Sequence, residues 1–159
     1  MAGVPIILLM VGKTRSAFLQ EGLAFYAKRL QFYHSLEVIT VREEKPQPRL
    51  SAAQIVAREG DRLLARLPRP SRVITLESQG EEFTSVNLAR WLANLFQAGS
   101  SPLVFIIGGH LGLAPAVSQA ADHHLALSRL TFTHEMSRLI LLEQLYRAAT
   151  IQAGHPYHN

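Results

Sequence analysis

Residues 103–107 have the sequence LVFII and are followed at 108–112 by GGHLG. Five consecutive apolar residues without polar alternation are typical of a short strand covered on both faces, as in a parallel sheet. The glycines allow a tight turn directly after this strand, and Pro115 is placed to begin a helix. The stretch therefore predicts a central buried strand that leads through a turn into a helix.

Strand-like and helix-like patterns alternate on either side of this stretch. Further short strands are expected at 4–11, 36–42, 72–77 and 124–127. Apolar residues at helical spacing predict helices at about 19–33, 51–67, 84–98 and 134–152. Strands that alternate with helices of this length indicate an α/β fold, with a parallel sheet covered by helices on both faces. We expect a single domain over residues 1–159.

Local signals refine these helices. Ser51 and Gln54 form a capping-box pattern at the start of the second helix, and Thr84 is placed to cap the third. Gly99 is expected to stop the third helix and Gly154 the last. In the first helix three phenylalanines are expected to widen the buried stripe: Phe18, Phe25 and Phe32.

Composition excludes several classes of protein. With 159 residues, 48% hydrophobic and 18% charged, the chain has the composition of a folded globular domain. It has no cysteine, which excludes a disulfide scaffold, a cysteine nucleophile and a thiolate metal site. The longest apolar run, 4–11, is about half of the roughly 20 residues that cross a bilayer. Lys13 and Arg15 follow that run, against the order of a signal peptide, so we expect a cytoplasmic protein without a membrane segment.

Charge is distributed unevenly along the chain. Residues 1–72 hold 12 of the 16 Lys and Arg residues and 6 of the 12 Asp and Glu residues, a net charge of +6, whereas residues 73–159 carry −2. A basic half suggests a polyanionic partner such as nucleic acid. A solvated face that only keeps the protein soluble would give the same pattern.

The glycine turn is the first candidate site. Ligands of open parallel sheets bind beyond the carboxyl ends of the strands, and glycine there lets a ligand approach the backbone. The turn lacks the Lys-Ser/Thr ending of a P-loop and the spacing of a dinucleotide fingerprint, so neither of these sites is expected. On spacing alone, Gly108, Gly109 and Gly112 form either a ligand site or only a tight turn.

Six of the seven histidines lie between 110 and 158. Adjacent residues of a strand point to opposite faces, so His123 and His124 are not expected to share a metal ion, and we expect no metal. His134 and Arg138 lie four residues apart on one helix face, where they contact either a ligand or only solvent.

Two further features lie near the end of the chain. Glu143 and Arg147 have the spacing of a helix-stabilising ion pair. Tyr157 and His158 pair an aromatic ring with a titratable ring, as binding of an unstacked base requires, or they form a frayed tail.

The chain resembles the RlmH family of SPOUT methyltransferases, and the resemblance covers essentially its whole length. In the C-terminal half the matching motifs are FIIGG at 105–109, LSRLTFTH at 127–134, LEQLYRAA at 142–149 and PYH at 156–158. In the N-terminal half they are VGKT at 11–14, YAKRL at 26–30 and REEK at 42–45.

This resemblance implies a homodimer whose C-terminal part forms a deep trefoil knot and binds S-adenosylmethionine. The implied reaction is methylation of ring N3 of a pseudouridine in 23S ribosomal RNA on the assembled ribosome. The cofactor contacts implied by the matching motifs are Leu76, Gly108, Gly109, Gly112, Leu127, Ser128, Arg129, Leu130, Thr131 and Phe132.

The resemblance also assigns roles around the target base. His134, His158, Arg138 or Arg147 would ease loss of the N3 proton, by base catalysis or electrostatically. We favour His158 with Tyr157 near the base, contributed by the tail of the partner subunit. The arginines, together with Lys13 and Arg15, are then expected to bind RNA.

Two alternatives to this reading stay open. A noncatalytic ribosome- or RNA-binding protein with the same fold would keep the basic face without transferring a methyl group. An enzyme acting on a small nucleotide is disfavoured because the phosphate motifs are missing.

Overall fold

The computed structural model describes residues 3–157 as five strands and five helices in strict alternation. The strands are β1 (Ile6–Val11), β2 (Leu36–Val41), β3 (Arg72–Glu81), β4 (Leu103–Ile107) and β5 (His123–Leu125). The helices are α1 (Ala17–Leu30), α2 (Ala52–Ala65), α3 (Ser85–Gln97), α4 (Pro115–Ala120) and α5 (His134–Ala153). All strand pairs are parallel, in the order β2-β1-β4-β3-β5.

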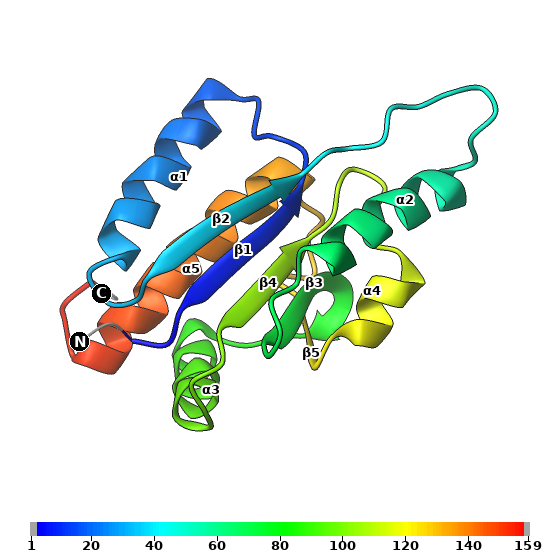
Figure 1. Ribbon diagram of the computed structural model, residues 1–159. Helices are drawn as coiled ribbons and strands as arrows, with labels where there is room; N and C mark the ends of the chain where they lie inside the picture. The colour runs from blue at the N-terminus through cyan, green and yellow to red at the C-terminus, as the bar shows by residue number, and fades with distance from the viewer. Residues whose placement is uncertain (1–2, 158–159) are drawn as a thin grey trace.

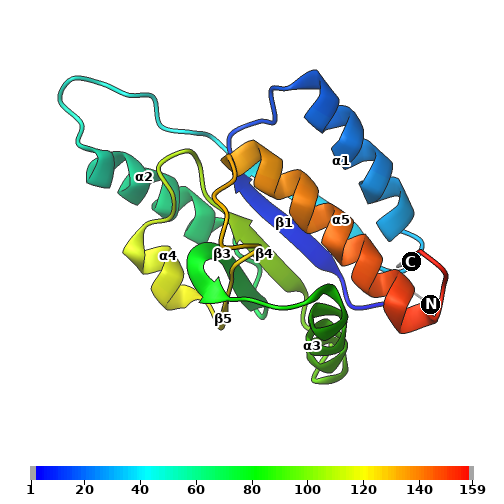
Figure 2. The same ribbon diagram turned by 180° about the vertical axis from the view of Figure 1, so that it is seen from behind.

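Alternate residues of the strands supply two separate cores. Ile6, Leu8 and Met10 of β1 belong to a core with α1, α3 and α5, whereas the residues between them face a core with α2 and α4. Figures 1 and 2 show these two groups of helices on opposite faces of the sheet. The sequence-based prediction of a parallel α/β sheet covered on both faces is confirmed. Whether the chain is knotted stays a prediction.

The predicted helix caps are present. Ser51 Oγ accepts from Gln54 N at 3.1 Å and Gln54 Oε1 accepts from Ser51 N at 2.8 Å, which completes the capping box. Thr84 Oγ1 accepts from Asn87 N at 3.2 Å. Gly154 ends α5 in the left-handed conformation, with φ +72°. The third helix already ends at Gln97, and Gly99 has no positive φ, so the expected glycine stop is replaced by an ordinary turn at Ala98.

Three strands have a boundary that differs from the prediction by more than one residue. β1 begins at Ile6 rather than Val4, because Ile6 is the first residue paired with both neighbouring strands. β3 continues to Glu81 rather than 77 because its end curls against β5, where Leu76 and Glu81 both pair with Leu125. β5 is shifted to His123–Leu125.

The prediction that three phenylalanines widen the buried face of α1 was wrong. Phe18, Phe25 and Phe32 are 63%, 48% and 88% exposed. Phe18 and Phe25 are seven residues apart and so lie on one side of α1, away from the core residues Leu19 and Leu30, whereas Phe32 lies in the turn after the helix. Helical periodicity identifies a stripe, but two neighbouring stripes of α1 are apolar and only one of them faces the sheet.

α5 runs against the direction of the strands. It begins at the carboxyl ends of the strands and ends beside their amino ends, near the start of β2 (Figure 1). Its 20 residues correspond to a length of about 30 Å. The first residues of α5 therefore lie beside the carboxyl ends of the strands and the last residues beside their amino ends.

A substitution in the central strand β4 tests this packing. Replacing Phe105, which is fully buried, by alanine leaves a cavity that the neighbouring helices cannot close. We expect Phe105→Ala to lower the free energy of unfolding by about 3–5 kcal/mol, measured by urea denaturation at fixed protein concentration. Val86→Ala on the exposed side of α3 is the control and should change it by less than about 0.5 kcal/mol.

Candidate functional site

Two adjoining cavities open where the carboxyl ends of β3, β4 and β5 meet. The larger has a volume of about 820 Å³ and the smaller about 130 Å³. Leu76, Phe132 and Ser137 line both, so we treat the two together as the strand-end cavity. This is the edge at which open α/β sheets bind their ligands.

The glycine turn after β4 forms one wall of the larger cavity. A Cβ on Gly108 would lie 2.6 Å from the carbonyl oxygen of Gly112, and one on Gly109 would contact Val11 and Glu59 at 3.3 and 3.5 Å. Gly112 has φ +86° and donates to the Gly109 carbonyl at 3.0 Å. At the three glycines the turn therefore presents backbone to the cavity, and His110 between them adds a side chain.

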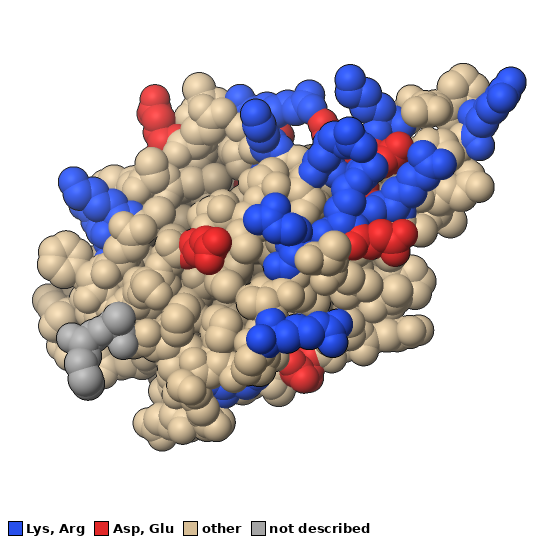
Figure 3. All heavy atoms as spheres, viewed as in Figure 1, with Lys and Arg blue, Asp and Glu red and all other residues tan. Residues whose placement is uncertain are grey.

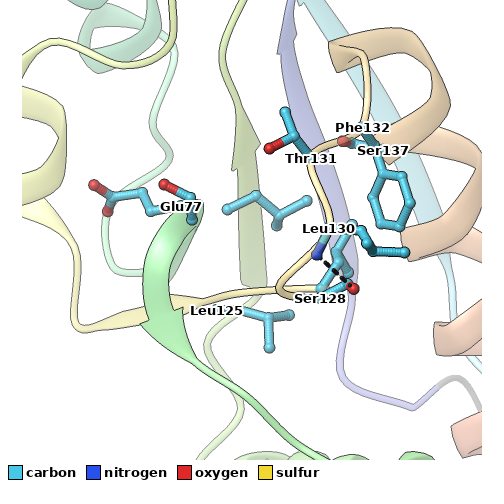
Figure 4. Close-up of a pocket in the computed structure, with 10 residues that line it drawn as sticks. Glu77, Leu125, Ser128, Leu130, Thr131, Phe132 and Ser137 are labelled. Atoms are coloured by element: carbon cyan, nitrogen blue, oxygen red, sulfur yellow. Dashed lines mark hydrogen bonds between the residues drawn. The ribbon is translucent and has the colours of Figure 1, made fainter.

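The segment 127–132 forms the wall of the smaller cavity. Ser128 Oγ accepts from Leu130 N at 3.0 Å, which fixes a tight turn within the segment (Figure 4). Leu127, Leu130 and Phe132 supply apolar surface to this cavity, and Ser128 and Thr131 supply hydroxyl groups. The wall thus offers both apolar and hydrogen-bonding contacts to a ligand.

Nine of the ten residues that the resemblance assigns to the cofactor line the strand-end cavity. They are Leu76, Gly108, Gly109, Gly112, Leu127, Ser128, Leu130, Thr131 and Phe132. Arg129 does not line it, because its side chain is 90% exposed and its Nε lies 3.4 Å from Glu82 Oε1.

The sequence analysis missed Glu77, which also lines the smaller cavity. Its carboxylate points away from the 127–132 segment (Figure 4). Ser118 Oγ donates to Oε1 at 2.6 Å, and Thr75 Oγ1 and His124 Nδ1 contact Oε2 at 2.5 and 2.6 Å. Burial raises the pKa of Glu77, but these hydrogen bonds outweigh it, so the pKa lies below its ordinary value. Its position as the last residue of the predicted strand 72–77 was the signal that could have identified it.

His134 lies at the first turn of α5 and lines the larger cavity, as do His110 and Glu135. Partial burial lowers the pKa of His134, and the nearby charge of Arg138 lowers it further. The His134 ring is therefore neutral at pH 7 and able to accept a proton.

Arg138 corrects the expectation that it binds RNA phosphate. It is fully buried, with 0% exposure, and donates from Nη2 to the Val11 carbonyl at 2.6 Å and from Nη1 to Thr14 Oγ1 at 2.9 Å. A guanidinium held under the turn after β1 cannot reach a phosphate outside the protein in this arrangement. The (i, i+4) spacing suggested a shared face with His134 but could not show that this side of α5 is covered.

Tyr157 and Arg147 lie at the far end of α5. Glu143 accepts from Arg147 Nη2 at 2.6 Å, as the spacing predicts, and from the Tyr157 hydroxyl at 3.0 Å. Burial and the Glu143 carboxylate raise the pKa of Tyr157, so its hydroxyl stays protonated. Glu143 and Arg147 follow His134 by nine and thirteen residues of α5, which correspond to about 14 and 20 Å along the helix axis. His158 lies outside the described residues.

Lys13 and Arg15 lie in a different pocket, at the carboxyl ends of β1 and β2. Neither of them lines the strand-end cavity. Within residues 3–157, no group of three or more His, Cys, Asp or Glu side chains is arranged to hold a metal ion. None of the helices in this range is long and apolar enough to cross a membrane.

Comparison with known proteins agrees with this geometry. The family model described as "Predicted SPOUT methyltransferase" matches residues 4–158. The chain belongs to this SPOUT methyltransferase family.

Relatives are similar over nearly their full length. The chain is 46% identical over 156 residues to ribosomal RNA large subunit methyltransferase H of Desulfitobacterium hafniense strain Y51. The matched region covers 96% of this chain and 98% of the relative. The chain is 44% identical over 154 residues to the putative ribosomal RNA large subunit methyltransferase H of Methanoregula boonei, which covers 95% and 97%.

Solved structures of low sequence identity share the fold. A probable methylase family protein from Haemophilus influenzae Rd KW20 superposes with a TM-score of 0.54 at 12% identity, covering 97% of this chain and 70% of that one. A probable methyltransferase from Bordetella pertussis Tohama I has a TM-score of 0.54 at 11% identity, covering 92% and 95%.

The effect of the Arg138 charge on the pKa of His134 should be measurable. We expect the His134 ring to titrate below the ordinary value of about 6.5 in an NMR titration, and Arg138→Met to move its pKa upward. Arg90→Met, on α3, is the control and should leave it unchanged. An unaltered His134 pKa in folded Arg138→Met would contradict the electrostatic coupling.

Proposed function

We propose that this protein is an S-adenosylmethionine-dependent methyltransferase that modifies ring N3 of a pseudouridine in 23S ribosomal RNA on the assembled ribosome. The observation that carries the proposal is the strand-end cavity, whose walls are the glycine turn and the 127–132 segment, in a chain of the SPOUT family. The names of the relatives over nearly the whole length support ribosomal RNA as the substrate. A ribosomal substrate would place the reaction in the cytoplasm.

The strand-end cavity fits the methyl donor. Leu76, Leu127 and Leu130 offer apolar surfaces that can cover the two faces of an adenine ring. Gly108 has no side chain, and a Cβ there would collide with the backbone of Gly112. S-adenosylmethionine supplies a methyl group that is already electrophilic on a positively charged sulfur. The residues present therefore need to orient the two reactants rather than to activate the methyl group.

Proton removal from N3 is the remaining task. His134 lines the larger cavity, and burial and Arg138 keep it neutral at pH 7, as a general base requires. The raised pKa of Tyr157 suits contact with a base through its ring or its protonated hydroxyl, and not proton removal. The family resemblance adds His158 as a second candidate base.

A homodimer would unite these residues. Tyr157 contacts Glu143, which lies about 14 Å from His134 along α5, so a site in which both residues reach one base would take them from two chains. The exposed phenylalanines of α1 are apolar surface of the kind that subunit contacts cover. We therefore propose that the tail of one subunit completes the cavity of the other.

A noncatalytic RNA-binding protein is the second candidate, and the clustered basic residues at the ends of β1 and β2 are the observation that favours it. Such a protein would bind ribosomes without transferring a methyl group. Transfer of label distinguishes the two functions directly.

The first test is transfer of labelled methyl from S-adenosylmethionine to ribosomes that lack the modification, with naked ribosomal RNA beside them. We expect label in N3-methylpseudouridine with ribosomes only. Gly108→Ala should lower transfer and cofactor affinity at least about tenfold, since the new methyl group would collide with the Gly112 backbone.

Gly99→Ala is the matched control, because nothing lies within 4 Å of its Cβ. Cofactor binding by the wild type without any transfer to ribosomes or RNA would favour the noncatalytic function.

The shared site can be tested by mixing two inactive variants. Tyr157→Ala removes the tail residue and Gly108→Ala the cavity, so a mixed dimer would hold one intact site made from one part of each chain. Equal mixtures, unfolded and refolded together, should recover about a quarter of the wild-type activity, as random pairing in a two-fold dimer gives. If both groups act within one chain, the mixture will stay inactive.

A further inference from the structure

A third pocket lies beside the strand-end cavity and has no role in the proposed transfer. It has a volume of about 720 Å³ and opens at the carboxyl ends of β1 and β2. Four of its lining residues are cationic: Lys13, Arg15, Arg42 and Lys45. The carboxylate in its lining, Glu43, pairs with Arg15, so three cations face the pocket without a carboxylate of the lining as partner. Its charge suits an anionic ligand.

A buried cation lies under the same pocket. The guanidinium of Arg138 donates to Val11 and to the pocket residue Thr14, while its Nε has no hydrogen-bond partner among residues 3–157. Within the same range no carboxylate oxygen comes within 4.0 Å of it. Burial lowers the pKa of Arg138, and the more distant carboxylates of Glu135 and Glu43 offset this only in part, so an anion above the guanidinium would offset it further.

The rim of the pocket is fixed in place by α2. Arg62 donates to the Arg42 carbonyl at 3.0 Å and pairs with Glu44, which also accepts from Arg58 at 3.1 Å. Glu44 N in turn donates to the buried Glu59 at 3.0 Å. The backbone that carries Arg42 and Lys45 is therefore fixed beside the pocket before any ligand binds, which lowers the entropy lost on binding.

The pocket is next to the strand-end cavity. The backbone amides of Arg15 and Ser16 donate to Glu135 Oε1 at 2.6 and 3.3 Å. Ser16 and Glu135 line the strand-end cavity, whereas Arg15 lines the basic pocket. A single segment, 13–16, therefore separates the two. Figure 3 shows Lys and Arg side chains gathered over this end of the sheet and along α2.

We propose that this pocket binds a backbone phosphate of the RNA, at a nucleotide next to the one that receives the methyl group. The inference rests on the proposed function, because the strand-end cavity must hold the methyl donor. The volume admits a whole nucleotide rather than an isolated anion, and Thr14, Thr40 and Gln20 offer polar groups to its sugar. Phosphate contacts of this kind set the position of the RNA without reading its sequence.

The test reverses charge in the pocket and compares it with equal reversal elsewhere. The variant is Lys13→Glu with Arg42→Glu, and the control is Arg69→Glu with Arg90→Glu, which are exposed and lie outside both pockets. The chain has no cysteine, so Ser100→Cys carries a single fluorescent label in every protein. Binding is measured to unmodified ribosomes and to a short oligouridylate at about 50 and 200 mM salt.

We expect the pocket variant to bind both RNA ligands at least about tenfold more weakly than the control and to show a salt dependence lowered by about one to two phosphate contacts. Its affinity for S-adenosylmethionine, measured by calorimetry, should stay within about twofold of the wild type, because the strand-end cavity is unaltered. Equal RNA affinity and equal salt dependence in variant and control would overturn the proposal.

The outcomes separate this inference from the proposed function. Weakened RNA binding by the pocket variant, together with a wild type that transfers no methyl group, keeps the phosphate pocket and removes the methyltransferase assignment. Normal transfer by the wild type, together with RNA binding by the variant equal to that of the control, keeps the methyltransferase assignment and removes the phosphate pocket. If ribosomes do not bind even the wild type, the oligouridylate measurement decides.

Discussion

The two-sided burial of β4 is the constraint on which the rest of this structure depends. All five of its residues are buried and apolar, so the polar groups that a ligand needs can lie only beyond the end of the strand. The parallel arrangement places the ends of β3 and β5 at the same edge. Both the glycine turn and the 127–132 segment are consequences of where these strands stop.

α5 connects that edge to the opposite one. Its first turn brings His134 and Glu135 to the strand-end cavity, its second turn buries Arg138 under the turn after β1, and Glu143 near its middle holds Tyr157. The helix therefore covers the sheet and also fixes the positions of groups that differ in their surroundings. The protonation states follow from these positions, since burial and then the charge of Arg138 lower the pKa of His134, and burial together with hydrogen bonds to Tyr26 and Glu143 raises the pKa of Tyr157.

The architecture could be predicted from the sequence because its signals are local. Continuous apolar runs identified the strands, and the Ser51–Gln54 box and Thr84 identified helix starts. The direction of a side chain could not be predicted in the same way. The phenylalanines that were expected to be buried are exposed, and the guanidinium of Arg138 that was expected at the surface is buried. Periodicity shows which residues share a face but not what covers that face.

Prediction of the site was similarly divided. The glycine turn is visible in the sequence alone, whereas the 127–132 segment and Leu76 were identified through the family motifs, since loops carry no periodic pattern. Glu77 escaped both approaches, because only the folded chain shows that Ser118, Thr75 and His124 converge on it.

The glycine turn limits how this cavity can evolve. A Cβ on Gly108 would collide with the Gly112 backbone, one on Gly109 would press against the side chains of Val11 and Glu59, and Gly112 has a positive φ that other residues rarely adopt. Because these three obstacles are independent, no single compensating substitution elsewhere can release all of them. Variation in this wall is left to the two residues between the glycines, His110 and Leu111, and a change of ligand preference that keeps the turn intact has to begin there.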